Sequence, residues 1–184
     1  MLKNILKRPW TAGLFIFLFA IVGRYLYMLP KFDEGVTAPD FFITINETGD
    51  SVYLSSLRGN LVLLDFWGSW CPPCRKDHAA LVKLYQPSKI TSIQPDAYLE
   101  IVSIGIEKSK KAWSQAIKND QLSWPYHLFD KSESLRFFNS PIAIQYGVKQ
   151  LPSRYLIDEN QKIIAVNPSI EYLTDLLLNH PVVH

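Results

Sequence analysis

LVLLDFWGSWCPPCRKDHAALVKL, residues 61–84, is the stretch that decides the fold. Its first part, 61–67, is an apolar run rich in branched residues, which predicts a buried strand. A turn at 68–70 follows, and two prolines then stand where a helix begins. Proline suits the first helical turn, because its missing N–H leaves no intrahelical bond unmade. The pattern predicts a strand, a turn and a helix, with the chain's two cysteines, Cys71 and Cys74, where the turn meets the helix.

The position of Cys71 predicts a reactive thiol. A residue before proline is disfavoured in α geometry, which suits an N-cap, so the sulfur is expected at the helix N-terminus. The partial positive charge and free amides there stabilise the thiolate, which is the nucleophilic form. We therefore expect Cys71 to attack a substrate disulfide and Cys74, one turn further in, to resolve the mixed disulfide.

The segment DFWGSWCPPCRKD resembles the active-site segment of the thioredoxin superfamily, with its Trp-Cys-x-x-Cys motif. Residues 36–179 are most similar to the membrane-anchored TlpA/ResA-type thiol:disulfide oxidoreductases. The resemblance implies that Cys71 and Cys74 are the redox pair and that Asp65 helps to move a proton to or from the inner thiol. Asp77 stands where ResA-like proteins carry a glutamate, so a shorter carboxylate is expected beside the motif.

A second segment, YGVKQLP at residues 146–152, resembles the loop that carries the cis-proline of the superfamily. The resemblance implies that Pro152 is this proline and orients the substrate, and that the Leu151 backbone pairs with an extended substrate segment. Family members often carry threonine after this proline, whereas Ser153 and Arg154 stand here, and Arg154 would favour acidic partners. The residues expected to contact substrate are Trp70, Pro72, Pro73, Leu151 and Pro152.

Other kinds of site use paired cysteines. His78, four residues after Cys74, is expected on the same side of the helix, so the pair could be half of a zinc site. A closed site needs a fourth ligand, but no other cysteine exists and the other histidines are isolated. Covalent haem attachment needs histidine directly after the second cysteine, where Arg75 stands instead. A structural disulfide closing so short a loop removes little unfolded-state entropy. We expect a redox pair with no metal and no cofactor.

Length, composition and charge limit the number of domains and the kinds of partner that the chain can have. At 184 residues the chain has the length of one domain plus an appendage, and 48% hydrophobic residues can fill a core. The formal net charge of +2 is small, and no basic patch is interleaved with stacking aromatics. Nucleic acid is therefore not an expected partner.

The N-terminal segment predicts membrane attachment. Lys3, Lys7 and Arg8 precede an apolar stretch at 10–29 that Arg24 interrupts. Its uninterrupted part, 11–23, has the length of a signal-peptide core, but no small-x-small cleavage site follows. We expect an uncleaved anchor through the lipid bilayer, with the N-terminus in the cytoplasm and the remainder outside. The family resemblance implies a bacterial cell membrane, a periplasmic or extracytoplasmic catalytic domain and a membrane electron donor.

The predicted organisation has three parts: a cytoplasmic tip and anchor at 1–30, a polar linker at 31–38 and a thioredoxin-like domain at 39–184. We expect the domain to open with an N-terminal hairpin. Strands are expected at 41–45, 51–54, 61–67, 98–106, 155–158 and 162–166. Helices are expected from 72 to about 87, at 108–119, near 140–146 and at 169–179. A polar loop is expected at 86–95 and a loose tail at 180–184.

Two features outside the motif could belong to a site: His127 and a group of aromatic residues. His127 could be a metal ligand or a base, although a lone histidine beside apolar residues is more often a packed side chain. The aromatic group could line a substrate groove, although core packing is the stronger expectation. Its members are Trp124, Tyr126, Phe129, Phe137 and Phe138.

The predicted fold class is α/β, with a thioredoxin-like central mixed sheet flanked by helices and tethered by one N-terminal transmembrane helix. The predicted function is reduction of protein disulfides, because Pro72 and Pro73 leave the Cys71 thiolate with few amide donors and a less stabilised thiolate favours the disulfide form. Substrates would be disulfide-containing or thiol proteins, with cytochrome c maturation as a family-level possibility. The alternatives are a thiol peroxidase on the same fold and a Sco-like copper-binding module. The first lacks its threonine-x-x-cysteine pattern, and the spacing here is one residue too short for the second.

Overall fold

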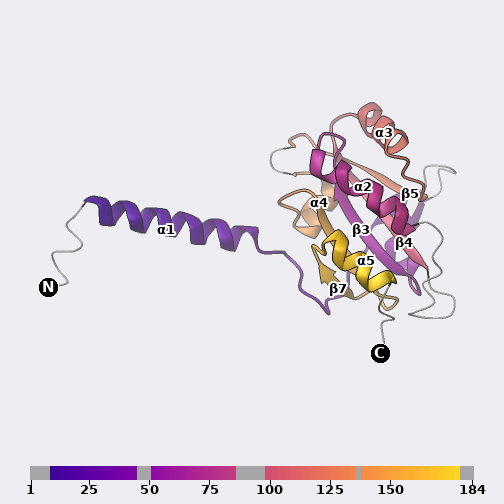
Figure 1. Cartoon of the computed structure of the whole chain (residues 1–184), viewed down its shortest axis with the longest axis horizontal. Helices are drawn as coiled ribbons and strands as arrows, with labels where there is room; N and C mark the ends of the chain where they lie inside the picture. Colours follow the sequence, from indigo (N-terminus) through magenta and orange to yellow (C-terminus); the bar gives the residue numbers. More distant parts are fainter. Residues whose placement is uncertain (1–8, 45–50, 86–97, 136–137, 179–184) are drawn as a thin grey trace. The chain divides into compact units, whose positions relative to one another are not determined.

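A computed structural model describes residues 9–44, 51–85, 98–135 and 138–178 (Figure 1). The chain divides into two units, Met1–Pro30 and Lys31–His184. The second unit starts at the predicted linker and includes the predicted catalytic domain. The two units are described separately below.

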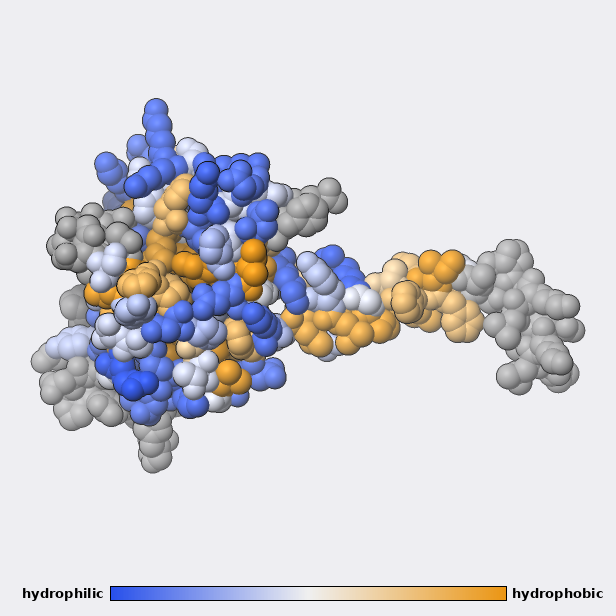
Figure 2. Space-filling view, turned by 180° about the vertical axis from the view of Figure 1, so that it is seen from behind, coloured by the Kyte–Doolittle hydropathy of each residue, from blue (hydrophilic) through white to orange (hydrophobic). Residues whose placement is uncertain are grey.

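The described residues of the first unit, 9–30, contain one helix, α1, from Pro9 to Met28. Its large apolar side chains are exposed, among them Phe15 at 61%, Ile16 at 71% and Phe19 at 81%. Figure 2 shows this apolar surface in orange along the helix. The predicted anchor, 10–29, falls largely in α1. Among the residues that the structure describes, no helix combines the length and the apolar character needed to cross a membrane.

The second unit is built on a five-stranded mixed sheet in the order β5-β4-β3-β6-β7. The central strand β3, Leu61–Trp67, is buried along its whole length. It pairs in parallel with β4, Leu99–Glu107, and antiparallel with β6, Ser153–Ile157. The edges are β5, Tyr126–Lys131, parallel to β4, and β7, Ile163–Val166, antiparallel to β6. The predicted thioredoxin-like mixed sheet is confirmed.

Alternate residues of β3 face two separate cores. Val62, Leu64 and Phe66 join the core that contains α4, Pro141–Tyr146. Leu61, Leu63 and Trp67 join the core beneath α2, Pro72–Tyr85, α3, Lys110–Asn119, and α5, Ile170–Leu178. Because side chains alternate along a strand, Asp65 points to the same face as Trp67. The only carboxylate of this strand therefore lies on the side of the sheet that carries the cysteine helix.

The predicted hairpin is present as β1, Phe42–Thr44, and β2, Ser51–Tyr53, paired antiparallel and followed by the 3-10 helix η2, Leu54–Leu57. The segment 31–38, expected as a linker, docks on the domain instead. The Gly35 N–H donates to the Ile163 carbonyl at 2.7 Å, and the Ala38 N–H donates to the Gln161 carbonyl at 2.9 Å. Phe32 packs on the Tyr146 ring with 5.9 Å between centroids. The backbone hydrogen bonds and the Phe32 ring therefore hold this polar segment beside β7.

Strand β5 was not predicted. The sequence YHLFDK mixes polar and apolar residues at a sheet edge, so it lacks the mostly apolar character that marks β3 and β4. Within the aromatic group, Trp124 is buried in the core on the α2 side, and Tyr126 and Phe138 pack against the other core. Phe137, the loop at 86–95 and the tail at 180–184 lie outside the described residues.

Candidate functional site

Cys71 and Cys74 form a disulfide at the start of α2. The Cys71 carbonyl accepts the Arg75 N–H at 3.2 Å, as an N-cap residue does. The Cys74 N–H donates to Cys71 Sγ at 3.3 Å, so one backbone amide points at the sulfur predicted to be the nucleophile. Pro72 and Pro73, which carry no N–H, are exposed between them. Cys74 is fully buried and Cys71 is 4% exposed, which places the predicted resolving thiol deeper.

The turn before Cys71 is fixed from β4. The Trp70 indole Nε1–H donates to the Ile106 carbonyl at 2.9 Å while its ring remains 39% exposed. A Cβ on Gly68 would lie 2.6 Å from the indole nitrogen, so glycine is what lets this ring fold back. Both the N–H and the hydroxyl of Ser69 donate to the buried Glu107 carboxylate. Burial raises the pKa of Glu107, although the two bonds from Ser69 act in the opposite direction.

Glu107 was missed from the sequence, because it is a lone acidic residue at the end of an apolar strand. Its partner, Ser69, lies 38 residues earlier in the chain. No local pattern connects the two positions. The parallel pairing of β3 and β4, which places Trp67 opposite Gly105, brings them together.

The Leu151–Pro152 peptide bond is cis, as predicted. Leu151 packs against both cores, including the one to which Cys71 and Cys74 belong. Ser153, the next residue, lies opposite Phe66 in the β3–β6 register. This pairing brings the loop to the end of β3 from which the cysteine turn leaves. The substrate contacts expected of Trp70, Pro72, Pro73, Leu151 and Pro152 remain predictions.

Arg154 does not face solvent. Its side chain is 5% exposed and bridges two carboxylates: Nε donates to Asp65 Oδ1 and an Nη donates to Asp77 Oδ2, each at 2.8 Å. Burial disfavours its charge, but Asp65 and Asp77 outweigh that effect and raise the pKa of Arg154. The expectation that Arg154 selects acidic partners is wrong, because its donors are already committed inside the protein.

A second charged group lies on the other side of Asp65. His78, 1% exposed, holds its Nδ1 2.7 Å from Asp120 Oδ2, and Arg75 donates to both oxygens of Asp120. Burial disfavours the Asp120 carboxylate, yet the bonds from Arg75 and His78 lower the pKa of Asp120. His78 Nε2 faces Asp65 Oδ2 at 3.9 Å. Across the described residues, no group of three or more His, Cys, Asp or Glu side chains is arranged to hold a metal.

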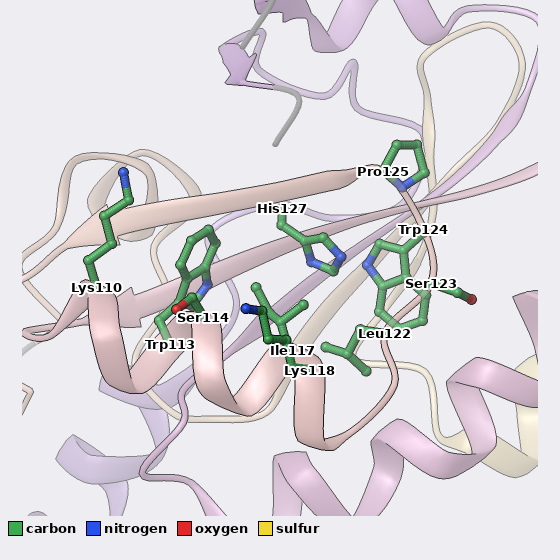
Figure 3. A pocket seen from close by; sticks show the side chains of 10 residues that line it. All are labelled: Lys110, Trp113, Ser114, Ile117, Lys118, Leu122, Ser123, Trp124, Pro125 and His127. Atoms are coloured by element: carbon green, nitrogen blue, oxygen red, sulfur yellow. The ribbon is translucent and has the colours of Figure 1, made fainter. Parts of the chain in front are cut away.

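A pocket of about 550 Å³ opens between α3 and the segment 122–127 (Figure 3). Its wall includes Trp113, Trp124 and His127, and the indole of Trp124 stacks on the imidazole with 5.6 Å between centroids. Burial lowers the pKa of His127 to about 4, although the nearby Leu122 and Trp124 carbonyls favour the charged ring. Neither cysteine lines this pocket, and His127 is a packed side chain as expected.

Three comparisons agree with this geometry. The model of the AhpC/TSA family matches residues 35–166. Thiol-disulfide oxidoreductase ResA of Bacillus cereus is 31% identical over 134 residues, which cover 73% of this chain and 69% of that protein. ResA of Bacillus subtilis is 28% identical over 84% of this chain and 80% of its own length. The thioredoxin domain of a thiol-disulfide oxidoreductase from Bacteroides vulgatus superposes with a TM-score of 0.63 at 25% identity, covering 79% of this chain and 95% of that domain.

Proposed function

Because this chain belongs to the AhpC/TSA family and is a thiol-disulfide oxidoreductase, we propose that it reduces disulfides of proteins outside the cytoplasm. The observation that carries the proposal is the Cys71–Cys74 disulfide at the N-terminus of α2, with the Cys74 amide directed at Cys71 Sγ. A helix N-terminus stabilises the thiolate that such an exchange needs. Relatives named thiol-disulfide oxidoreductase ResA cover most of the same domain.

The reaction begins with the dithiol form. The Cys71 thiolate attacks one sulfur of a substrate disulfide, and the other substrate sulfur leaves as a thiolate that takes a proton from water. Cys74 then loses its proton and attacks Cys71 Sγ, which forms the Cys71–Cys74 disulfide and releases the second substrate sulfur as a thiolate that takes a proton from water. Two electrons pass from the protein to the substrate. A thiol donor must return them before the next turnover.

The reducing direction is proposed from the missing amides. Positions 72 and 73 are both proline, so Cys74 supplies the one N–H from the Cys-x-x-Cys segment that points at Cys71 Sγ. A thiolate with fewer donors is less stabilised than its disulfide, which favours a low potential. A glycine or histidine in this segment would add a donor, and the protein would then become more oxidising.

Location and electron supply are further parts of the proposal. The basic residues Lys3, Lys7 and Arg8 and the apolar segment 10–29 support attachment to the bacterial cell membrane with the second unit outside the cytoplasm. The exposed apolar side chains of α1 fit a lipid environment. The donor would then be a membrane protein. Alkaline extraction of cell membranes tests attachment, and release of the chain by this treatment would contradict it.

An equilibrium redox titration of the chain against glutathione and dithiothreitol, with thiol trapping, tests the function. We expect a reversible two-electron couple below the glutathione range. The Cys74→Ser variant should accumulate a mixed disulfide with a test substrate, and the Cys71→Ser variant should not. A strongly oxidising potential would contradict the reducing direction. Faster reaction with peroxide than with a disulfide protein would favour a peroxidase, and tight copper binding by the dithiol form would favour a Sco-like module.

A further inference from the structure

Two buried atoms beside the redox pair face each other without a hydrogen-bond partner in the described part of the chain. They are Asp65 Oδ2 and His78 Nε2, and both side chains are 1% exposed. Buried polar atoms nearly always have a hydrogen-bond partner, so two unsatisfied atoms separated by 3.9 Å need an explanation. The gap exceeds a hydrogen bond by about 1 Å and is too narrow for a bridging water.

The hydrogen bonds around the two atoms fix what each can do. Asp120, held by Arg75, is a carboxylate and accepts only, so His78 Nδ1 must donate to it. This tautomer leaves a lone pair on Nε2 when the ring is neutral. Asp65 uses Oδ1 to accept from Arg154, so its Oδ2 is also an acceptor. Two acceptors face each other, and a proton on His78 Nε2 replaces the repulsion between two lone pairs with an attraction between the imidazolium and the carboxylate.

The charge of the surrounding network favours the same proton. Asp65, Asp77 and Asp120 supply three carboxylates, and Arg75 and Arg154 supply two guanidinium groups. Arg75 and Asp77 lie at the partly exposed rim of this network, at 37% and 29% exposure, whereas Asp65, Arg154 and His78 are buried. A neutral His78 leaves the network with one uncompensated negative charge, and a charged His78 neutralises it. Buried charges need partners. His127, whose pKa is lowered to about 4, is uncharged near pH 7 and adds no charge to this network.

We propose that Asp65 and His78 form a proton-holding pair for Cys74, with the proton on His78 Nε2 in the disulfide form. Cys74 and His78 are one turn apart on the buried face of α2, which packs on the face of β3 that carries Asp65. In the dithiol form the proton belongs to the Cys74 sulfur. When Cys74 attacks Cys71 Sγ, the proton moves to the pair as the new S–S bond forms and the bond from Cys71 to the substrate sulfur breaks. Asp120, 11% exposed, gives the pair a route to the surface.

This inference deepens the proposed function, because it adds His78 to Asp65, which the family resemblance already assigns to proton transfer at the inner thiol. His78 is a positioning and proton-holding residue rather than a nucleophile. The step consumes no further reactant. The proton that leaves Cys74 is the one that returns to it when a thiol donor reduces the disulfide.

The first experiment needs no substitution. In the full chain with ¹⁵N-labelled histidine, the two ring nitrogens of His78 are followed by NMR in the disulfide form and after reduction with a small dithiol. We expect both nitrogens to carry a proton in the disulfide form and Nε2 to lose it on reduction, at one pH between 6.5 and 7.5. An Nε2 that is unprotonated in both forms would overturn the proposal. Because the protein's own disulfide is read, this result stands even if no protein substrate is reduced.

The second experiment separates the two chemical steps with His78→Gln, which retains a donor for Asp120 but holds no charge. We expect the resolving step to slow at least about tenfold, as loss of a general base does. Mixed-disulfide formation, measured in a Cys74→Ser background, should be unchanged. His127→Gln, a change at the other buried histidine among the residues that the structure describes, is the control and should alter neither step. Equal slowing of both steps by His78→Gln would mean a merely structural role. Absence of any exchange by the unaltered protein would instead reject the proposed function.

Discussion

His127 makes the domain less stable at low pH. It is buried on β5 against Trp124, and neither ring nitrogen makes a hydrogen bond within the described residues. Its pKa is lowered to about 4 in the folded protein, whereas an unfolded histidine titrates near 6.5. The unfolded chain therefore binds the proton more readily. Stability is complete above about pH 6.5 and falls as the pH drops toward 4.

We predict that His127→Phe removes much of this loss. Phenylalanine keeps a ring of similar size on Trp124 and carries no titrating group. Between pH 7 and pH 4 the unaltered protein should lose about 3 kcal/mol more unfolding free energy than the variant, which is the size that the difference in pKa implies. Urea unfolding at several pH values measures it. Phe129→Leu, also on β5, should weaken the fold with no change in the pH slope. Parallel curves for the unaltered protein and His127→Phe would contradict the prediction.

Residues close in sequence were predictable, and residues that meet only in the fold were not. Cys71, Cys74 and the start of their helix follow from one short motif. The cis bond before Pro152 is confirmed too, but it came from resemblance rather than from physical reasoning. Arg154 meets Asp65 across 89 residues, and a sequence gives no sign of whether an arginine points inward. His78 was predicted on the same side of the helix as Cys74, yet its partner Asp120 comes from the end of α3.

At the scale of elements, the approach of α3 to the sheet depends on one glycine. A Cβ at Gly105 on β4 would lie 2.5 Å from the Trp113 indole and 3.4 Å from the Leu128 carbonyl. Trp113 is 3% exposed and is the largest side chain that α3 buries. The helix therefore rests on the sheet through an indole that fits over a residue without a side chain.

We predict that Gly105→Ala destabilises the domain by about 1 to 3 kcal/mol, because an added methyl group overpacks this contact. Trp113→Leu alone should also destabilise, since it leaves a cavity. The double variant should lose about 1 kcal/mol less unfolding free energy than the sum of the two single losses, because the smaller side chain makes room for the methyl group. Chemical unfolding of the four proteins gives the coupling. Strict additivity would show that the indole does not limit how closely α3 approaches.

The elements that were predicted differ in kind from the one that was missed. β3 and β4 are buried along almost their whole length and read as mostly apolar runs. The amphipathic pattern of α3 and the Ser109 cap, which accepts the Ala112 N–H, mark a helix with clear limits. β5 has neither signal, because one edge is free of sheet neighbours and its residues alternate between core and polar contacts. Its place is set by pairing with β4, a tertiary cause.

For the whole molecule, the structure moves the start of the catalytic unit from the predicted residue 39 to Lys31. The segment 31–38 covers the outer edge of β7 through the backbone of Gly35, Val36 and Ala38. Lys31 Nζ also donates to the Gln145 carbonyl at 2.8 Å. An uncovered edge strand presents unpaired backbone groups and promotes association between chains. The segment thus covers the edge of the sheet at the start of β7, through bonds to Ile163 and Gln161.

We therefore predict that a fragment of residues 31–184 unfolds at the same urea midpoint as the second unit of the full chain in detergent. A fragment of residues 39–184 should be less stable by about 2 to 4 kcal/mol, because it loses the Phe32 contact with Tyr146 and the backbone bonds to β7. It should also associate at high concentration, which light scattering measures. Replacing Phe32 with alanine in the longer fragment separates the two contributions, since the backbone bonds remain. Equal midpoints for the two fragments would mean that 31–38 is a linker after all, and a lower midpoint for 31–184 than for the full chain would mean that the first unit stabilises the second.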